Sequence, residues 1–478
     1  MAYSTINKST AHMSVKTYSG NDATSHAISG IGHFPDLVWL KRRNGTNDHQ
    51  LQDSVRGKSG TNYQYIQSNN TNAQSVQGDN DGVNTLGADG FTVGHTNSGA
   101  WNESGATYCS WNWKAGGTAP TKTYKVVVVS DSGNKYRFRN SADTATFAQS
   151  AVTLNLQEGG TYTFDVSDST MNSHPFVIGT AANSSEYSTG VTYKLDGVTK
   201  TYSQYTSGFS AATSRQLIIT VAASAPALYY WCSAHSGMGG AINTNVTHGS
   251  SNFDGNKQSL VSANSTSGFS IIKYSGSGSS STIGHGLSSA PGVILVKRIS
   301  GSDSWTVYHK GIGAGKYLRL DGNAAEASNS NTWANTAPTS TTFSVNHDDT
   351  NANGVTFVAY CFAEVPGYCK IGTYVGNGST DGTFVYTGFK PSFILTKTTA
   401  TDGWRIIDNK RLGYNPNNSL LQPNITQADS DQTWHDIMSN GFKLRTTDTG
   451  DNGNGTTYTY MAIGQSIVGS NNIPATAR

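Results

Sequence analysis

Short apolar segments alternate with turns along almost the whole chain. FVAYCF at residues 357–362 and YKVVVV at residues 124–129 have the length and the β-branched or aromatic content of single buried strands. Gly, Asn and Ser fill the stretches between such segments, as they do in turns. No long stretch repeats apolar residues with the period of a helix, so we expect few and short helices. The pattern predicts an all-β protein.

One strand pattern occurs three times. Each copy begins with a Tyr two residues before a Gly, has a Pro 17 residues after that Tyr, and has a Lys six residues after that Pro. These positions are Tyr18, Pro35 and Lys41 in the first copy, Tyr274, Pro291 and Lys297 in the second, and Tyr374, Pro391 and Lys397 in the third. Constant spacing of this kind is the signature of a repeated module. In each copy we expect the Pro to stand at a turn that opens a buried strand.

The copies continue to match after the Tyr, Pro and Lys positions. A second strand starts at His49, Trp305 or Trp404, and an Asn–Gly turn leads into a final aromatic strand in every copy. We interpret the two tryptophans as core residues rather than as a sugar-binding platform. The copies span residues 1–118, 258–368 and 369–478. A length of about 100 residues with several short strands is typical of a β-sandwich or jelly-roll-like module.

A segment that lacks this spacing of Tyr, Pro and Lys separates the first copy from the second. It contains strand-like text of its own, including VTLNL at residues 152–156 and TYTFDV at residues 161–166. Linker-like text lies on both sides, at residues 113–122 and 250–259. We therefore predict a separate β-domain over residues 122–247, inserted after the first module.

Candidate metal ligands concentrate at the end of this insert. Cys232, His235 and Met238 follow an aromatic strand with two residues between each pair, and His174 lies upstream. A type 1 copper site needs one thiolate, two imidazoles and a weak thioether ligand, and these four side chains supply that set. The residues alone leave three interpretations open: a copper site, a zinc site, or packing around a site that binds no metal.

The same four residues resemble the cupredoxin family. Its small blue-copper members carry an upstream His before a strand and a Cys-His-Met loop near the end of the domain, and the match is at His174, Cys232, His235 and Met238. The short spacing resembles the amicyanin-type loop, whereas plastocyanin-like loops place the Met two residues later, where this chain has Gly240. The resemblance implies a Greek-key β-domain with copper as its cofactor.

Composition narrows the choice of partners. Charged residues make up 13% of the chain, and 32 basic against 30 acidic residues leave a net charge of +2. Because capture of nucleic acid relies on an excess of basic residues, we expect no nucleic-acid partner. No apolar run is long enough to span a bilayer, and the first residues lack the apolar core of a signal peptide. We therefore expect no membrane span and synthesis in the cytoplasm.

Other residues receive ordinary structural interpretations. Cys109, Cys361 and Cys369 lie in or beside apolar strand-like text and are expected to pack in the core. KRRNG at residues 41–45 is expected to form a solvated cationic turn. The chain contains no G-x-S-x-G pattern, no phosphate-binding Gly loop and no H-E-x-x-H pattern, so the sequence does not predict an enzyme.

The flanking repeats resemble structural proteins of marine tailed bacteriophages. The resemblance rests on GHFPDLVWLKRRNG at residues 32–45, SGATYCSWNWKAGG at 104–117, the closing VGSNNIPATAR at 468–478 and, in the insert, YYWCSAHSGMGG at 229–240. It implies a virion component made in the host cytoplasm: a fibre, a tail appendage or a capsid decoration. Other virion proteins would be its partners, and we expect a homo-oligomer.

Two further functions stay open beside this structural role. Loop tips of the second and third copies would bind a host-surface glycan or receptor if the protein takes part in host attachment. A copper-loaded insert would transfer electrons or sense the metal.

Overall fold

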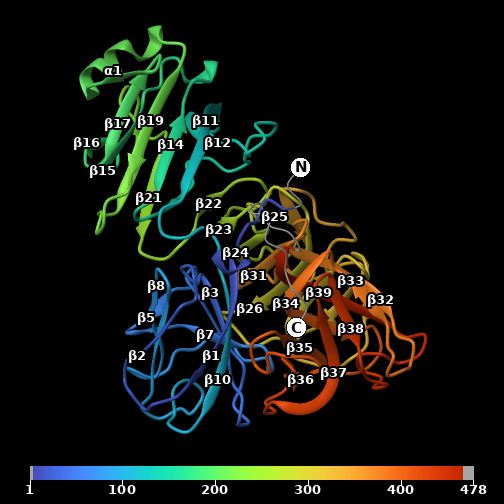
Figure 1. The fold of residues 1–478 in the computed structure, drawn as a ribbon. Coiled ribbons are helices and arrows are strands. Elements are labelled where there is room, and N and C mark those ends of the chain that lie inside the picture. Colours follow the sequence, from blue (N-terminus) through green and yellow to red (C-terminus); the bar gives the residue numbers. More distant parts are fainter. Residues whose placement is uncertain (1–3, 467–478) are drawn as a thin grey trace. The chain divides into compact units, whose positions relative to one another are not determined.

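The computed structural model describes residues 4–466, so the closing VGSNNIPATAR motif lies outside the described residues. The chain divides into two compact units, whose strands Figure 1 labels. Gly116–Ser262 and Thr282–Gly286 form one, here called the inserted unit, and the other described residues form the repeat unit. Strands dominate both units, so the all-β prediction is confirmed.

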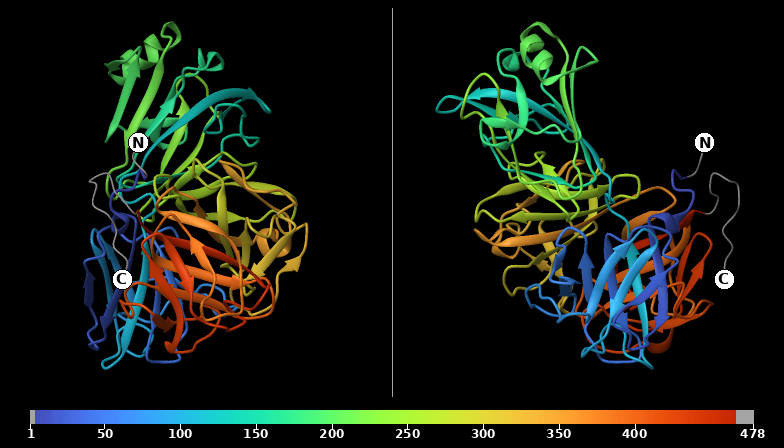
Figure 2. Two further views of the ribbon diagram at one scale, coloured as in Figure 1. Left: turned by 45° about the vertical axis from the view of Figure 1, so that its right-hand side comes forward. Right: turned by 90° about the vertical axis from the view of Figure 1, so that its left-hand side faces the viewer.

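The first copy of the repeat is a two-sheet sandwich. Its larger sheet has the order β1-β10-β3-β4-β7, its smaller sheet has the order β2-β9-β8, and β5 pairs with β6. The elements are η1 (Ser9–Ala11), β1 (Met13–Ser19), β2 (His26–Ser29), β3 (Leu37–Arg42), β4 (Gln50–Asp53), β5 (Lys58–Ser59), β6 (Asn62–Tyr63), β7 (Tyr65–Gln67), β8 (Gly82–Gly87), β9 (Gly90–Gly94) and β10 (Thr107–Trp113). Figure 2 shows them from blue to cyan.

The third copy repeats this architecture with sheets β32-β39-β34-β35 and β33-β38-β37-β36. Its strands are β32 (Cys369–Val375), β33 (Phe384–Tyr386), β34 (Phe389–Thr398), β35 (Trp404–Asp408), β36 (Asn417–Leu420), β37 (Ser430–Met438), β38 (Gly441–Leu444) and β39 (Thr457–Ser466). Strands β32, β39, β34 and β35 take the places of β1, β10, β3 and β4, with the same antiparallel pairings.

The second copy contributes the strand order β24-β31-β26-β27-β28-β29 to the repeat unit. Its elements are β24 (Phe269–Ser275), β26 (Pro291–Arg298), β27 (Thr306–His309), β28 (Lys316–Arg319), β29 (Ala327–Ser328), β30 (Thr342–Val345), α2 (Asp348–Asn351) and β31 (Thr356–Ala363). Helix α2 has four residues and the only other α-helix of the described chain has seven, so the expectation of few and short helices is confirmed.

The repeated prolines differ in their placement from the prediction. Pro35 precedes β3, as expected, but Pro291 lies in β26 and Pro391 in β34, each at a shift of register. A proline has no N–H for the ladder, and a bulge is where a sheet tolerates that loss. In the second copy the strand thus begins at the proline itself, and only in the third copy does it extend through the proline.

Each copy stacks two aromatic rings at equivalent positions. The first Tyr of the repeat packs on the aromatic residue of the final strand with ring centroids 4.9 to 5.4 Å apart and nearly parallel planes. The pairs are Tyr18–Tyr108, Tyr274–Phe357 and Tyr374–Tyr458. In each copy the Tyr hydroxyl also donates to the carbonyl that precedes the turn Asn, at Trp101, Thr350 or Asp451. The three copies therefore share one core arrangement, and their repetition is a property of the structure.

The repeated lysines are buried in all three copies. Their ammonium groups donate to two main-chain carbonyls each, and no carboxylate is among these partners. Burial lowers the pKa of Lys41, of Lys297 and of Lys397 to about 8. In the first and third copies both carbonyls lie within four residues after the lysine, whereas Lys297 binds one carbonyl of its own copy, at Asp303, and one of the first copy, at Thr71.

The prediction of a solvated KRRNG turn is wrong. Lys41 is fully buried, Arg42 pairs with Glu103, and the Arg43 Nε donates to Asp429 of the third copy at 2.7 Å. This turn is cationic because it meets acidic groups of its own copy and of another copy, which the local sequence does not reveal.

The three copies close into a ring through equivalent main-chain hydrogen bonds. The acceptor is always the carbonyl eight residues after the repeat Pro, and the donor is an N–H of another copy. These bonds run from Gln74 to Ile299, from Glu326 to Thr399 and from Asp429 to Arg43, at 3.2, 2.9 and 2.7 Å. The first copy thus binds the second, the second binds the third and the third binds the first, which gives the repeat unit an approximate threefold symmetry.

In every copy, the side chain of the last residue of the second strand also contacts the next copy. The Asp53 carboxylate accepts from the Tyr360 hydroxyl at 2.7 Å, and the Asp408 carboxylate accepts from the Trp111 indole at 3.1 Å. In the second copy a histidine takes this place, and His309 Nε2 lies 3.2 Å from the Tyr460 carbonyl. Burial lowers the pKa of His309 to about 4, so the imidazole is neutral at this junction.

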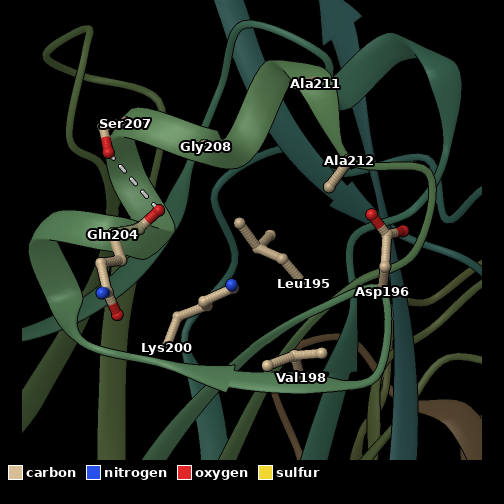
Figure 3. Close-up of a pocket in the computed structure, with 9 residues that line it drawn as sticks. All are labelled: Leu195, Asp196, Val198, Lys200, Gln204, Ser207, Gly208, Ala211 and Ala212. Carbon is tan, nitrogen blue, oxygen red and sulfur yellow. Dashed lines mark hydrogen bonds between the residues drawn. The ribbon is translucent and has the colours of Figure 1, made fainter.

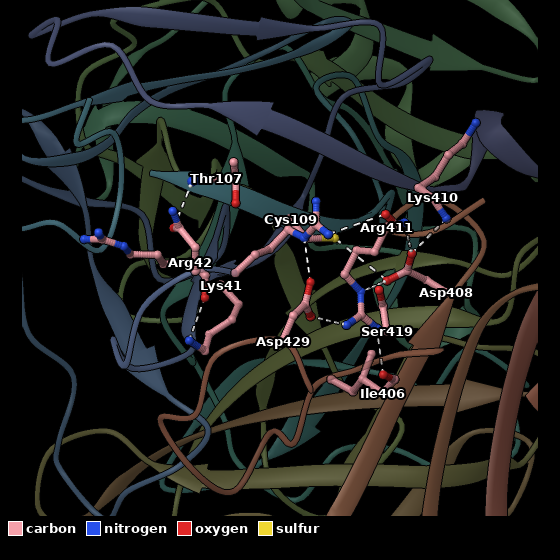
Figure 4. A network of polar contacts seen from close by, with 12 residues as sticks. Lys41, Arg42, Thr107, Cys109, Ile406, Asp408, Lys410, Arg411, Ser419 and Asp429 are labelled. Atoms are coloured by element: carbon pink, nitrogen blue, oxygen red, sulfur yellow. Dashed lines mark hydrogen bonds and ion pairs between the residues drawn. The ribbon is translucent and has the colours of Figure 1, made fainter. Parts of the chain in front are cut away.

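Buried ion pairs hold two of these acidic residues. Arg56 pairs with Asp53 and Arg411 pairs with Asp408, and all four side chains are inaccessible to solvent. Figure 4 shows Arg411 between Asp408 and Asp429, with Cys109 of the first copy beside them. Burial by itself would raise the pKa of Asp408, but Arg411 outweighs this effect and lowers it. The carboxylate therefore stays ionised inside the junction.

Aromatic side chains fill the centre of the ring. Trp113 packs against Phe393 at 5.4 Å and against Phe362 at 6.0 Å between ring centroids, so one residue from each copy meets there. Trp305 and Trp404 are buried as well and donate to Gln67 and Arg319 of other copies. The interpretation of the two tryptophans as core residues is confirmed. Cys109, Cys361 and Cys369 are also buried, as expected.

The inserted unit is a sandwich of two mixed sheets, β12-β11-β14-β19-β17-β18 and β13-β21-β20-β15-β16. Its elements are β11 (Thr121–Ser130), β12 (Asn134–Phe138), β13 (Leu154–Gln157), β14 (Thr161–Asp165), η2 (Ser169–Met171), β15 (Phe176–Ala181), β16 (Ser184–Glu186), β17 (Val191–Leu195), β18 (Val198–Lys200), α1 (Tyr202–Gly208), η3 (Phe209–Ala211), β19 (Arg215–Thr220), β20 (Leu228–Cys232), β21 (Gly240–Asn245) and β22 (Ser250–Asn252). Strand β23 (Ser259–Asn264) pairs with β22, and β25 spans Ser281–Gly284. One continuous aromatic and aliphatic core lies between the sheets.

Helices of the described residues 4–466 are all too short or too polar to cross a membrane.

Asp408 offers a test of the ring. Asp408→Asn keeps the shape of the side chain but leaves the buried Arg411 with half of its compensating charge. We expect the repeat unit to lose about 3 kcal/mol of its free energy of unfolding, as removal of one partner from a buried pair does. Denaturant titration followed by tryptophan fluorescence measures this loss. Asp381→Asn is the control: its carboxylate pairs with Lys443 while 81% exposed, so this substitution should leave the free energy of unfolding almost unchanged. Equal losses in the two variants would contradict the importance of the junction.

Candidate metal centre

Two neighbouring strands bring the predicted ligands together. β15 and β20 are antiparallel, with Phe176 opposite Cys232, so the start of one strand lies beside the end of the other. His174 stands two residues before Phe176, and the Ser233 N–H donates to the Pro175 carbonyl at 3.1 Å. This pairing places His174 next to the loop that follows Cys232, although 58 residues separate the two in the sequence.

Three of the four predicted ligands form a tight triangle. The Nδ1 atoms of His174 and His235 are 3.1 Å apart, and the Cys232 Sγ lies 3.9 Å from the first and 3.6 Å from the second. Within residues 4–466, these three residues form the one group of His, Cys, Asp or Glu side chains close enough to share a metal ion.

The spacing of these atoms fits a single small ion. Metal bonds to imidazole nitrogen and to thiolate sulfur are about 2.0 and 2.3 Å long, so two ligands of one ion lie about 3 to 4 Å apart. All three distances fall in that interval. A thiolate with two imidazoles is the trigonal donor set of blue copper sites and also suits zinc. The residues present therefore fit a copper or a zinc ion.

Met238 is on the same loop but has a different environment. Its side chain is buried in the core of the inserted unit, with 1% exposure, and its carbonyl accepts from the Tyr136 N–H at 2.9 Å. The structure thus fixes the main chain at Met238 beside β12, while its role as an axial ligand stays a prediction.

Glycines shape the loop that carries the ligands. Gly237 has a φ of +74°, its N–H donates to the Asn183 side chain at 3.0 Å, and its carbonyl accepts from the Lys135 ammonium. At Gly239 an added Cβ would lie 1.7 Å from the Tyr230 carbonyl oxygen, a distance no side chain tolerates. The loop can pack this closely on its own strand only with glycine there.

Tyr136 is a neighbour of the site that sequence analysis did not identify. Its hydroxyl donates to the His174 carbonyl at 2.9 Å and so fixes the segment that carries one ligand. Burial raises the pKa of Tyr136, and the nearby Cys232 thiol adds to this effect. The local sequence NKYRF does not indicate this role for its tyrosine. The contact arises only when β12 packs over the ligand loop.

The environment of His174 disfavours protonation of its imidazole. Burial and the neighbouring His235 together lower the pKa of His174. A neutral imidazole is the form that binds a metal. The arrangement therefore keeps His174 ready to bind at neutral pH.

The site is open to solvent on one side. His235, Ser236 and Gly237 are exposed, whereas Cys232 is buried. The thiol is thus protected from bulk solvent, while an ion or a redox partner can reach the edge of His235.

A second hollow in the inserted unit lies beneath helix α1. Its volume is about 540 Å³, and Figure 3 shows Leu195 and Lys200 pointing into it. Asp196 is at its rim, but this carboxylate already accepts from the N–H groups of Thr213 and Ser214. Gln204 and Ser207 line it as well, so the hollow mixes polar and aliphatic side chains, and its one carboxylate is already held by main-chain N–H groups.

Gly239 offers a test of the ligand loop. In Gly239→Ala the new methyl group would collide with the Tyr230 carbonyl, so the loop or the end of β20 must shift. We expect the inserted unit to lose about 2 kcal/mol or more of stability, as overpacking in a close backbone contact does. Thermal unfolding followed by circular dichroism measures this effect. Gly78→Ala is the control, since nothing lies within 4 Å of its added Cβ. Unchanged stability of Gly239→Ala would contradict the close packing of the loop.

Comparison with known proteins gives a family without an assigned role. Searches of curated proteins and of solved structures find no match. The model of one family, described as a domain of unknown function (DUF7483), matches residues 8–137 and 241–466. This match covers nearly all of the described repeat unit and leaves out residues 138–240, which include His174, Cys232, His235 and Met238. Because most of the chain is covered, the protein is a member of the DUF7483 family.

Proposed function

We propose that this protein is a structural component of a tailed-phage virion, placed as a fibre, a tail appendage or a capsid decoration. The observation that carries the proposal is the closed ring of three sandwiches, joined by equivalent main-chain bonds and by side-chain hydrogen bonds to Asp53, Asp408 and Asp429 from neighbouring copies. Such a body is rigid and self-contained, which suits a particle part that must keep its shape outside a cell. The resemblance of the repeats to structural proteins of marine tailed phages supports the same role.

The surface chemistry supports contact with proteins or glycans rather than with nucleic acid. Acidic and basic residues are nearly equal in number, and many are paired within the chain, as at Lys125–Asp143 and Lys310–Glu364. A phosphate backbone needs an unpaired basic surface. Other virion proteins are therefore the first partners we propose, and a host-surface glycan or receptor is the second.

Mass spectrometry of purified particles tests the structural role. We expect peptides of this chain in gradient-purified virions of the phage that encodes it, at a fixed ratio to the major capsid protein. Digestion with nuclease before purification is the control, since a protein carried along on released DNA would disappear. Absence of the chain from purified particles would refute the proposal.

A second candidate function, metal binding in the inserted unit, is favoured by one specific observation. Two imidazoles and one thiol lie within metal-ligand distance of each other at the end of paired strands. We propose a type 1-like copper centre, with His174, Cys232 and His235 as ligands and Met238 as the expected axial ligand. Bound copper would supply one-electron redox chemistry, and the chain's own part is to hold the donors in place and to shield the thiolate.

Titration with Cu(II) tests this second function. We expect one equivalent to produce an intense visible absorption band from the thiolate–copper bond, because the thiolate donates charge to the ion. Cys232→Ser should abolish the band, while Cys361→Ser, which changes a buried cysteine of the repeat unit, should leave it unchanged. Competition with Zn(II) distinguishes the two metals. A band that persists in Cys232→Ser, or no band in the unmodified protein, would remove the copper assignment.

A further inference from the structure

One buried histidine of the repeat unit occupies a place at which the other copies carry a tryptophan. Trp305 and Trp404 stand at the start of the second strand of their copies, and each indole donates to a main-chain carbonyl of a neighbouring copy. His49 stands at the same place in the first copy, where Arg411 and the main chain of Gln422, both of the third copy, act on its imidazole. A histidine therefore replaces a tryptophan at the junction of the first and third copies.

A second buried histidine occupies a place at which the other copies carry an aspartate. His309 ends β27, as Asp53 ends β4 and Asp408 ends β35. Its Nε2 atom lies 3.2 Å from the Tyr460 carbonyl of the third copy. The turn after it packs directly on that copy, because a Cβ added at Gly311 would collide with a side chain of β32. This histidine thus lies in the tightly packed junction of the second and third copies.

The junctions of the third copy therefore differ from the remaining one. Each of them contains one of the two histidines. The junction between the first and second copies has Trp305 and Asp53 at the same two places, and neither of these side chains gains a charge when the solution becomes acidic. Histidine is the side chain whose charge changes between about pH 5 and 8. A change of pH in that interval can thus act on the third copy alone.

Hydrogen bonds fix the position of the proton on each imidazole. The Trp39 indole donates to His49 Nδ1 at 3.1 Å, and the Gly311 N–H donates to His309 Nδ1 at 3.0 Å. An N–H group can only donate, so Nδ1 is the acceptor in both rings and the single proton is on Nε2. A second proton could be added only at Nδ1, where it would face an N–H and break that hydrogen bond.

Neighbouring cations also oppose a second proton on His49. Burial is the largest cause that lowers the pKa of His49 well below its ordinary value, and the Lys41 ammonium of β3 and the Arg411 guanidinium add to it. Asp408 and Asp429 hold Arg411 through ion pairs, so this cation stays in the junction. The His49 imidazole is therefore neutral while the ring is closed.

The charges around His309 form ion pairs of their own, so burial decides its protonation. Burial lowers the pKa of His309 to about 4. The Tyr460 carbonyl and the Glu364 carboxylate partly offset this effect, whereas Lys310 adds to it. Glu364 is itself paired with Lys310 and with Lys370 of β32. Both junction histidines are thus neutral in the closed ring.

Acid weakens these two junctions. A free imidazole has a pKa of about 6.5, so above that pH the histidines are neutral in the closed and in the opened ring, and the junctions keep their full strength. As the pH falls below about 6.5, the opened ring binds a proton at each histidine and the closed ring does not. Closure is therefore lost progressively as the pH falls toward the pKa of about 4 that His309 has in the closed ring.

We propose that the third copy is the acid-releasable part of the ring: protonation of His49 and His309 detaches it from the other two copies, which stay joined to each other. The third copy keeps its own fold in this process, because its two sheets and its core are built within the copy. The protein would thus have a closed form at neutral pH and an open form in acid. The inference rests on the ring alone and holds whether or not the chain binds copper or belongs to a virion.

Hydrogen exchange of the full chain, measured at single amides, tests the proposal. The amides of Gln74, Glu326 and Asp429 report on the three junctions through their main-chain bonds. Between about pH 7 and about pH 5, after correction for intrinsic exchange, we expect the protection of the Glu326 and Asp429 amides to fall about 20-fold or more, because each histidine that gains a proton contributes about that factor. The Gln74 amide should change by less than about threefold.

The Leu444 amide distinguishes detachment from unfolding. It donates to the Thr383 carbonyl within the third copy, so it should keep its protection if the copy moves as a folded body. Equal loss of protection at Leu444 overturns the proposal, because the copy then unfolds instead of detaching. Unchanged protection of Glu326 and Asp429 at about pH 5 overturns it as well, and this measurement needs only the unmodified chain.

Substitution assigns the effect to the two histidines. In the double variant His49→Gln/His309→Gln each side chain can still accept an N–H but does not titrate, so both junctions should stay protected at about pH 5. His347→Gln is the matched control: His347 also accepts a main-chain N–H, that of Asp349 at 3.3 Å, but its side chain is 37% exposed. It should keep the pH dependence of the unmodified chain. A double variant that loses protection as the unmodified chain does contradicts the role of these histidines and overturns the proposal.

Discussion

The repeat unit depends on one recurring interaction, the main-chain hydrogen bond that each copy donates to the carbonyl eight residues after another copy's proline. Three such bonds close the ring only if all three copies are present, because each copy is donor to one neighbour and acceptor from the other. The ring in turn buries Asp53–Arg56 and Asp408–Arg411, whose charges are tolerable only where every hydrogen-bonding atom finds a partner. Packing of Trp113 against Phe362 and Phe393 at the centre follows from the same closure.

Small differences among the copies show how one module is adapted to three places. Where the first and third copies end their second strand with Asp, the second ends with His309, which meets a carbonyl instead of a hydroxyl or an indole. The buried lysines do not vary, and each amine donates to two main-chain carbonyls, although one partner of Lys297 is Thr71 of the first copy. The outer edge differs as well: Ala27 and Ser29 of the first copy stand where the third copy has Phe384 and Tyr386.

The inserted unit is not a copy of the repeat. The family match covers residues 8–137 and 241–466, so β15, β20 and the loop that carries His235 lie outside the matched residues. Their chemistry needs only the pairing of β15 with β20, which brings His174 to the Cys232 loop. Any role of the metal is therefore an addition to the role of the ring, and the two functions can be tested apart.

Sequence spacing was sufficient to predict the all-β class, the threefold repeat and a separate insert, because strand periodicity and turn residues are local properties. It also named His174, Cys232 and His235 as candidates, because their side chains match a known set of metal ligands, although His174 lies 58 residues before Cys232. Spacing did not reveal that Arg43 meets Asp429, that Pro391 lies inside a strand, or that the Tyr136 hydroxyl donates to the His174 carbonyl. Those contacts join residues from different strands or copies, and only the tertiary structure decides which polar groups share a buried space.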